Sequence, residues 1–494
     1  MTDNLIVAQL PLLPDSLLPP KQTRKWADLN SFWQHPERLP AFVRDSPTVM
    51  RNLALLGPLD WATFPERNLE RHWGQPQIPF AALAAAELIK LNDGCASWGK
   101  LHRYLVEHPG FIWLLGFPLQ PAPNHPLGFN AQASLPTHRH LVRMLRQVPN
   151  AALQFLLADS VRLILTELAG LGLAPPECVS LDTKHILAWV KENNPKTYVT
   201  ERFNKAQQPA GDPDCRLGCK RRTNQGAAPA TPTRNPVSSQ GLKRGQYYWG
   251  YGSGVVVTKV PALGEFVLAE LTQPFDQGDV TYFFPLMQQS ENRLGYRPRL
   301  GTFDAAFDAW YVYAYFHREN SPASGFAAVP FSAKGGYQAD GRQFTSEGLP
   351  LCAAGLAMPL QFTFTDRTSC LVEHERGKYR CPLTPNRAGR VACPIRHVNA
   401  KRGGCTAVMP ISIGARLRYT LDRQGEAYKD AYRQRTAVER TLAPARKCRC
   451  QQPGVGPGHR TTTPAQRPRH HQPEHPHLCL DQPALLAAPA RPTA

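Results

Sequence analysis

The sequence has no long uninterrupted apolar run. None of its 494 residues belongs to a stretch approaching the ~20 apolar residues that a bilayer-spanning helix needs. The most apolar segment, 155–173, carries Asp159, Arg162 and Glu167, which is typical of an amphipathic helix. The amino-terminal segment has an acid and no basic region before its apolar residues, so we expect no secretory signal. These absences exclude a membrane-spanning protein and predict a cytoplasmic one.

Acidic residues are also scarce. The chain has 38 Asp and Glu against 57 Lys and Arg, which gives a formal net charge of +19. Its 42% hydrophobic content excludes a disordered polycation, and its length predicts several domains. The excess positive charge either keeps the protein soluble or attracts a polyanion, usually a nucleic acid. Charge alone leaves both interpretations open.

Because no export signal is present, the twelve cysteines are expected to be reduced thiols or metal ligands and not disulfides. Five of them lie in a segment rich in glycine and proline, and four of these are candidate metal ligands: Cys352, Cys381, Cys393 and Cys405. Thiolates beside glycine turns are typical ligands of structural Zn²⁺. Their separations of 29, 12 and 12 residues do not match closely spaced ligand pairs, so ordinary reduced core cysteines remain the alternative.

Changes in composition and periodicity predict six consecutive segments. Strands and helices alternate between about 173 and 332, and this alternation predicts an α/β core. The expected segments are an irregular Pro-rich start (1–75), a helical DNA-binding domain (76–172), the first part of the core with a basic loop at 191–245 (173–332), a β-rich Cys-containing segment without helices (333–420), a charged helix that completes the core (421–441) and an irregular tail (442–494).

Basic residues suggest where DNA would bind. In the helix expected near 138–146, Arg139, Arg143 and Arg146 lie beside an apolar stripe and could follow a phosphate backbone. A solvated surface helix is an equally good interpretation of that pattern. Further candidate contacts lie beside the first strand acid and in the basic loop: Lys184, Lys220, Arg221 and Arg222.

Three acids stand out by their placement. Asp182 and Asp304 each follow an apolar strand, at the end where open α/β sheets place their ligands. Glu439 lies on the late charged helix, where Tyr432 and Arg435 precede it by seven and four residues and so share its helical face. An acid at a strand end is usually a helix cap or a solvated turn residue. Each aspartate alone therefore indicates little.

Taken together, these residues resemble the Asp-Asp-Glu transposases of bacterial insertion sequences. The segment YRQRTAVER matches the Tyr-x2-Arg-x3-Glu signature of that family at Tyr432, Arg435 and Glu439. The segment GTFDAAFD is similar to the one around the second aspartate, with Phe307-Asp308 in place of Tyr-Asp, and SLDTKHILAWVKENNPK resembles the first. The resemblance covers roughly residues 50–440, including a helical domain before the core.

The resemblance implies a fold and a chemistry. The fold is a ribonuclease-H-like α/β core, interrupted by a β-rich insertion and preceded by an α-helical domain. Asp182, Asp304 and Glu439 would hold two Mg²⁺ ions, with Mn²⁺ as a substitute, because three gathered carboxylates stay ionised only beside a cation. Two such ions stabilise the attacking and leaving oxygens of a phosphodiester. Arg435 would hold a phosphate, and Tyr432 would position the DNA backbone or a base.

The implied partners are the terminal repeats of an insertion sequence and target DNA, both double-stranded. The active complex would be a homodimer, because two ends are cut together, and it would work at the bacterial nucleoid. Two rival functions share these features: a DNA-binding remnant without catalysis, and a stand-alone metal-dependent nuclease.

The chain departs from the family pattern in two places. The family expects Lys seven residues after the glutamate, where this chain has Arg446 followed by Lys447. After Thr441 the sequence loses its periodicity, and reading residues 470–483 one base later permits an ordinary amphipathic segment. We hypothesise a frameshift near codon 441, which would make this a weakly active or inactive copy. The alternative is a disordered basic tail that adds DNA affinity.

Overall fold

The computed structural model describes residues 28–69, 77–220, 246–261, 263–318, 321, 324–332, 342–367, 371–383, 393–395 and 405–447. These residues form two compact units. The helical unit contains the described residues up to Pro175 together with 210–214, and the sheet unit contains the others. The division at Pro175 lies close to the boundary predicted at 172. In the described part of the chain, no helix is both long and apolar enough to cross a membrane.

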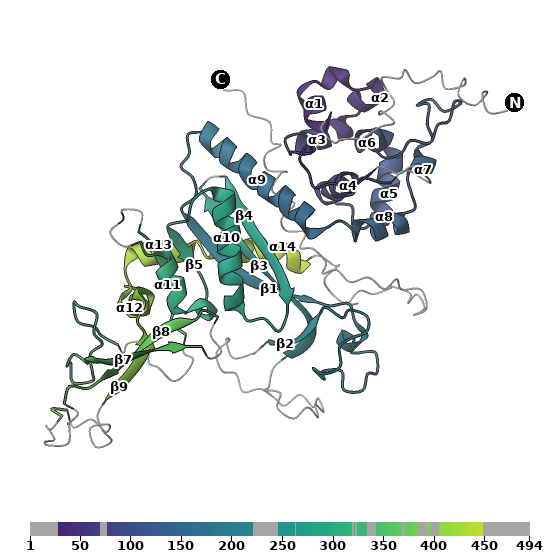
Figure 1. The fold of residues 1–494 in the computed structure, drawn as a ribbon. Coiled ribbons are helices and arrows are strands. Elements are labelled where there is room, and N and C mark those ends of the chain that lie inside the picture. The colour runs from purple at the N-terminus through teal and green to yellow at the C-terminus, as the bar shows by residue number, and fades with distance from the viewer. Residues whose placement is uncertain are drawn as a thin grey trace. The chain divides into compact units, whose positions relative to one another are not determined.

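The helical unit consists of short helices around one apolar core (Figure 1). Helix α4 is largely buried, because its small alanine side chains let neighbouring helices pack closely against it. Ala81, Leu83 and Ile89 are completely buried. The helices are α1 (Asp28–Gln34), η2 (Pro36–Arg38), α2 (Ala41–Arg44), α3 (Pro47–Leu56), α4 (Phe80–Asn92), α5 (Trp98–Glu107), α6 (Pro109–Leu114), α7 (Ala131–Ser134), α8 (His138–Leu145) and α9 (Asn150–Gly170).

The irregular segment predicted for 1–75 is wrong for residues 28–56, which form α1 to α3. The prolines that suggested irregular structure occupy first helical positions, as Pro36 and Pro47 do, where the missing N–H has no role. Val49, Leu53 and Leu56 then bury one face of α3 in the common core. Such short helices depend on tertiary packing, which propensity does not reveal.

The sheet unit is built on a mixed six-stranded sheet, and the predicted α/β class is confirmed. The strands are β1 (Cys178–Leu187), β2 (Arg216–Lys220), β3 (Gln246–Val260), β4 (Gly264–Pro274), β5 (Leu300–Thr302) and β6 (Phe326–Ala328). Strands β1, β5 and β6 are adjacent and parallel. Strand β3 is antiparallel to β1, and it also pairs with β2 and β4.

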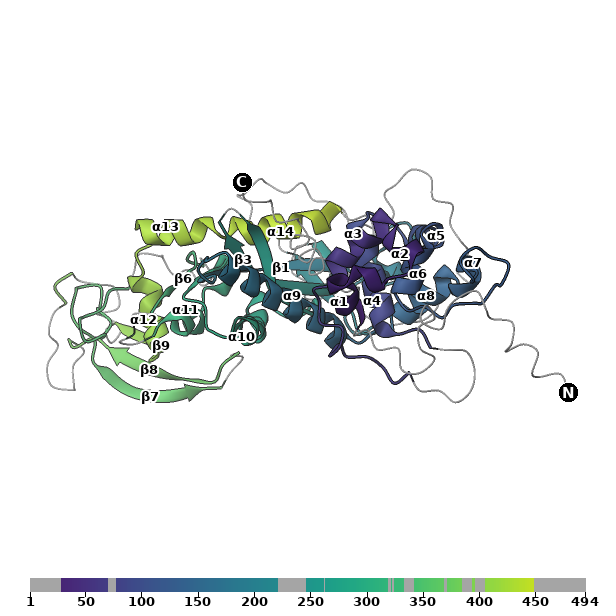
Figure 2. The ribbon, with the colours of Figure 1, turned by 90° about the horizontal axis from the view of Figure 1, so that it is seen from above.

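Helices cover both faces of this sheet, as Figure 2 shows. Helix α10 (Phe283–Leu294) follows η5 (Asp279–Tyr282) and lies on one face. The Tyr282 hydroxyl donates a 2.7 Å hydrogen bond to the Gly252 carbonyl, and a Cβ on Gly254 would lie 2.6 Å from the Tyr282 ring. Gly252 and Gly254, which have no side chain, therefore allow Tyr282 to lie close to β3 on that face of the sheet. Helices α13 (Glu426–Arg433) and α14 (Thr436–Lys447) run end to end along the other face.

A second, antiparallel sheet lies within the segment predicted to be β-rich. Its strands are β7 (Leu360–Asp366), β8 (His374–Arg380) and β9 (Thr406–Pro410), in that order. Helix α12 (Ile413–Thr420) also falls in this segment, which was predicted to have no helix. Gly414 allows this helix to pack directly on α11 (Trp310–Phe316), because a Cβ at Gly414 would lie 2.0 Å from the Trp310 carbonyl. The helix is therefore fixed by close packing on α11.

The single charged helix predicted near the carboxyl end is wrong, because the chain breaks between α13 and α14. At the break, the Gln434 and Arg435 N–H groups bond three residues back, to Ala431 and Tyr432. The Gln434 carbonyl accepts a 3.1 Å hydrogen bond from the Ser180 hydroxyl of β1. A tertiary hydrogen bond thus holds the turn. Helix α14 continues to Lys447, past the loss of periodicity after Thr441, and the remaining tail lies outside the described residues.

Candidate functional site

Asp182 and Asp304 lie next to each other in the sheet unit. Strands β1 and β5 are parallel, with Ser180 opposite Thr302, and each aspartate follows two residues later. The Ser180 and Thr302 hydroxyls are 2.7 Å apart and buried, which locks this register. Asp304 follows the end of β5, but the predicted strand-end position of Asp182 is wrong, because β1 pairs with β3 as far as Leu187 and Asp182 lies within it. Asp182 lies just beyond the residues of β1 that pair with β5, and it is therefore a neighbour of Asp304.

Helices α13 and α14 cover these acids on one side. Side chains two residues apart on a strand share a face, so Asp182 points to the same face as Ser180. The Ser180 hydroxyl donates to the Gln434 carbonyl, which leaves Thr302 as the donor to Ser180. This chain of hydrogen bonds joins β5, β1 and the α13–α14 turn. It holds Arg435 and the start of α14 over the ends of the two strands.

Arg435 and Glu439 form an ion pair across one turn. Arg435 Nη1 lies 2.9 Å from Glu439 Oε1, and the side chains are 22% and 48% exposed. The Arg435 Nε is buried without a hydrogen-bond partner among the described residues. Arg435 thus offers one N–H that an incoming ligand could satisfy. Because an unsatisfied buried donor is costly, an anionic ligand would be favoured there.

The charges at this site act on one another. The pKa of Asp182 is raised to about 6, mainly by burial; the negative charges of Asp304 and Glu439 contribute to the rise, and the Thr183 N–H and Arg435 oppose it. For Arg435, burial works to lower the pKa, but Tyr432 and the three acids raise it overall. Acids separated by 122 and 135 residues in the sequence therefore share one electrostatic environment.

Tyr432 does not share a helical face with Glu439, because the break separates α13 from α14. It lies in the last turn of α13 and stacks on Tyr428, with ring centroids 5.7 Å apart and an interplanar angle of 10°. Its side chain still influences the charge of Arg435. Tyr432, Arg435 and Glu439 are therefore near one another, but they belong to two helices and the turn between them and not to one helix.

The donor set suits a hard divalent cation, because carboxylate oxygens are its preferred ligands. A cation would also offset the repulsion that helps to raise the pKa of Asp182. No group of three or more His, Cys, Asp or Glu in the described ranges could hold a metal ion as it stands. Asp304 accepts the Ala306 N–H at 2.8 Å, and Glu439 is paired with Arg435. Cation binding would require both carboxylates to turn from these partners.

Replacing Asp182 by Asn is expected to stabilise the metal-free protein at pH 7.5. The pKa of Asp182 rises from 3.8 to about 6 on folding, so its charge opposes folding above pH 6. This free-energy cost of the buried charge decreases as the pH falls through 6, because Asp182 becomes protonated in the folded protein, and it is absent below pH 3.8. We expect a gain of about 1–3 kcal/mol at pH 7.5 and none near pH 4, measured by urea unfolding.

The exposed Asp430, which is paired with Arg433 on α13, provides the matched control. Asp430→Asn should leave the unfolding free energy nearly unchanged at both pH values. A loss of stability in Asp182→Asn that is equal at pH 4 and pH 7.5 would contradict the assigned electrostatics.

The predicted DNA contacts are only partly described. Arg139 and Arg143 are exposed on α8, and Arg146 is exposed at its carboxyl end. Lys184 lies on β1 two residues beyond Asp182 and therefore shares its face. The Lys220 side chain lies outside the described residues, as do Arg221 and Arg222.

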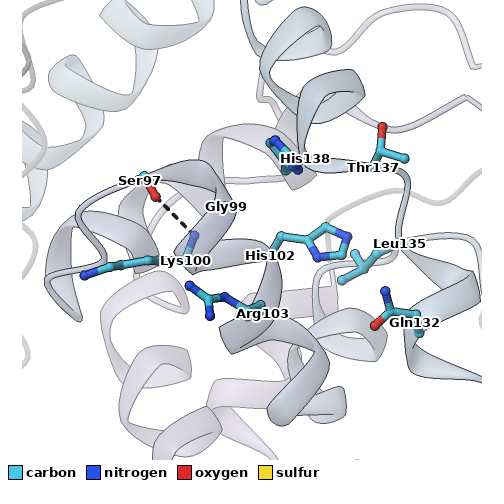
Figure 3. Close-up of a pocket in the computed structure, with 9 residues that line it drawn as sticks. All are labelled: Ser97, Gly99, Lys100, His102, Arg103, Gln132, Leu135, Thr137 and His138. Carbon is cyan, nitrogen blue, oxygen red and sulfur yellow. Dashed lines mark hydrogen bonds between the residues drawn. The ribbon is translucent and has the colours of Figure 1, made fainter. Parts of the chain in front are cut away.

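A basic pocket in the helical unit was missed by the sequence analysis. It has a volume of about 630 Å³ and lies between the starts of α5 and α8 (Figure 3). Its lining includes Lys100 and Arg103 and no acid: Ser97, Gly99, Lys100, His102, Arg103, Gln132, Leu135, Thr137 and His138. Ser97 and Thr137 cap the two helices, and this pair of caps was the available sequence signal.

His102 is held neutral in this pocket. Burial lowers its pKa, and so does the charge of His138, while a hydrogen bond to the Pro136 carbonyl acts in the opposite direction. Two permanent cations, Lys100 and Arg103, without an acid in the lining favour an anionic occupant. A DNA phosphate has the required charge.

The structure also places the four predicted zinc ligands. Cys352, Cys381, Cys393 and Cys405 all belong to the sheet unit, in or near the second sheet, and none of the four forms a disulfide. They lie in a different part of the unit from the three acids.

Comparison with known proteins gives no match: no protein-family model, no curated protein and no solved structure matches this chain. The geometry of the site must therefore carry the functional interpretation by itself.

Proposed function

We propose that this protein is a DNA transposase, which binds the ends of an insertion sequence and catalyses Mg²⁺-dependent cleavage and strand transfer. One observation carries the proposal. Asp182 and Asp304 are neighbours in the β1–β5 register, and the charges of Asp304 and Glu439 raise the pKa of the buried Asp182 while that of Arg435 opposes them. Perturbed acids of this kind are typical of functional sites.

The fold supports the same proposal. Of three adjacent parallel strands, β1 contains Asp182 and β5 is followed by Asp304, and the second sheet separates β6 from the helix that bears Glu439 in the sequence. We propose that this unit is a ribonuclease-H-like core with a β-rich insertion. Both features agree with the resemblance in the sequence.

Each side chain has a distinct part in the proposed reaction. Bound Mg²⁺ would activate the attacking oxygen and neutralise the leaving one. Asp182, Asp304 and Glu439 would hold it, and Asp182 is largely ionised above pH 6. Arg435 would donate its unpaired Nε–H to a phosphate oxygen, which its planar guanidinium fits well. The Thr302–Ser180–Gln434 hydrogen bonds position Arg435 and Glu439.

We propose double-stranded DNA as the partner, bound by a homodimer. The basic pocket and α8 provide cations for the phosphate backbone. Lys100→Ala with Arg103→Ala should weaken DNA binding at 50 mM salt and reduce the slope of log K against log[salt] by about 0.9 per lost contact. Fluorescence anisotropy at several salt concentrations measures both quantities.

Arg44→Ala is the matched control in the same unit, because Asp45 lies 3.6 Å from Arg44 and offsets its charge. This substitution should leave the salt dependence unchanged. An unchanged slope in the Lys100/Arg103 double variant would show that the pocket does not contact DNA.

A decayed copy is the second candidate, and Pro444 favours it. Pro444 lies inside α14, where it removes an N–H from the helix that carries Glu439. A proline in a helix interior costs about 3 kcal/mol, and this one follows the proposed frameshift near codon 441. We propose that the frameshift weakened an active ancestor and left DNA binding intact.

The test is cleavage of DNA that carries the element's own terminal repeats, with Mg²⁺, by this chain and by a frame-restored version. Strand-transfer products would support a transposase, whereas cleavage alone would indicate a nuclease. Binding without cleavage by both versions would indicate a DNA-binding remnant. Equal cleavage by the two versions would contradict the frameshift proposal.

A further inference from the structure

Cys381 and Cys405 face each other at one end of the second sheet. The β8–β9 register pairs Arg380 with Thr406, so the next pair in this antiparallel ladder is Cys381 with Cys405. The Cys381 N–H donates a 2.8 Å hydrogen bond to the Cys405 carbonyl, which confirms that the ladder continues. Directly opposed residues have Cβ atoms about 4.5–5.5 Å apart. The two thiols are therefore near neighbours.

Cys352 reaches the same place through a tight turn. The Gly355 N–H bonds to the Cys352 carbonyl at 2.9 Å, and Gly355 has a φ of 75°, which favours glycine. The next N–H in the turn, that of Ala353, hydrogen-bonds to the Cys405 thiol. Cys352 and Cys405 also pack against one apolar cluster that contains Met358 and Tyr379. The turn thus meets the end of the sheet.

Cys393 completes the group. Burial raises the pKa of Cys405, and the charges of Cys381, Cys352 and Cys393 raise it further. All four thiols are thus close enough to interact electrostatically.

We propose that Cys352, Cys381, Cys393 and Cys405 bind one structural Zn²⁺ as a tetrahedral tetrathiolate. The paired ladder end and the glycine turn supply opposite sides of the site. In the described ranges, no three such side chains could hold a metal as they stand. Binding therefore requires the thiols to turn about their Cα–Cβ bonds until each Sγ lies about 2.3 Å from zinc.

The site has a structural purpose. Among the described residues, the apolar cluster next to it contains five buried side chains: Met358, Tyr379, Ala407, Met409 and Ala415. Small β-rich segments with little core commonly need a metal or a disulfide for stability. Zinc would join the turn at Cys352 to the ends of β8 and β9. This inference does not depend on the proposed cleavage chemistry, and its failure would leave that proposal standing.

The test measures zinc in the full-length protein, purified with reductant and without chelator. We expect about one zinc ion per chain by elemental mass spectrometry. Co²⁺ exchanged into the protein should give the intense visible bands and thiolate charge-transfer absorption of a tetrahedral site. Cys381→Ser and Cys405→Ser should each lose most of the metal, whereas Cys95→Ser, a free thiol in the helical unit, should retain it.

A measurement on the unmodified chain guards against variants that fail to fold. Titration of the thiols with an organomercurial should release zinc in proportion to the modification of four cysteines. A zinc-free protein that is stable and folded would overturn the proposal. A Cys381–Cys405 disulfide found under non-reducing conditions, or a Cys381→Ser/Cys405→Ser protein that retains its zinc, would do the same.

Discussion

Glu439→Gln is expected to reduce Mg²⁺-dependent DNA cleavage by about 10³-fold and to leave DNA affinity unchanged. If this copy is too weakly active, the frame-restored version is the background for the measurement. Glutamine keeps the shape of the side chain and removes its charge. The substitution therefore takes one carboxylate from the cation and also breaks the 2.9 Å ion pair with Arg435. Single-turnover cleavage and anisotropy binding separate the two effects.

Glu426→Gln is the control for this prediction. Glu426 lies on α13, is 74% exposed and pairs with Lys429 at 3.0 Å. Its substitution removes the same charge from the same face of the protein and should leave the cleavage rate within about twofold, as for an ordinary surface change. If Glu439→Gln also cleaves within twofold of its parent, Glu439 has no part in catalysis.

Breaking the buried ion pair between Asp308 and Arg418 is expected to cost about 3–5 kcal/mol of unfolding free energy. The Asp308 side chain is completely buried and accepts hydrogen bonds from Arg418 Nε at 2.7 Å and the Tyr313 hydroxyl at 2.8 Å. The Ser332 N–H donates a further bond to it at 2.8 Å. Arg418→Met would leave this carboxylate buried without its cation.

The exposed pair Arg433–Asp430 on α13 is the comparison. Arg433→Met should cost less than about 1 kcal/mol, because solvent already screens both charges. Urea unfolding of the two variants at pH 7.5 gives the difference. Equal losses would mean that Asp308 does not hold α12 to the core. Because α12 precedes the α13–α14 turn with Arg435 and the helix α14 with Glu439, Arg418→Met should also weaken cleavage.

Much of the sheet and two of its three acids follow from local sequence pattern. β1 and β3 contain apolar, β-branched runs, and Asp182 and Asp304 were found because each follows a short apolar run, although β1 continues past Asp182 to Leu187. The break between α13 and α14 could not be predicted in this way. Its cause is the hydrogen bond from Ser180, a residue 254 positions earlier in the chain, and no local period records that contact.

Other features could not be predicted from the sequence for the same reason. The basic pocket combines side chains from α5, α7 and α8, and only the folded chain brings them together. In the sequence, Phe307-Asp308 resembled a variant of the Tyr-Asp pair of the family. In the structure, Asp308 forms a buried ion pair with Arg418. The helices at 28–56 were hidden because prolines at helix starts were interpreted as irregular structure.

The central claim is that Asp182, Asp304 and Glu439 form one cation site, and Mn²⁺ titration followed by electron paramagnetic resonance tests it most directly. Mn²⁺ prefers oxygen ligands and should not occupy the cysteine site. We predict that the unmodified chain binds Mn²⁺, that Asp182→Asn and Asp304→Asn each weaken binding at least about tenfold, and that Asp430→Asn does not. If both active-site variants bind Mn²⁺ as tightly as the unmodified chain, the three acids do not form a cation site.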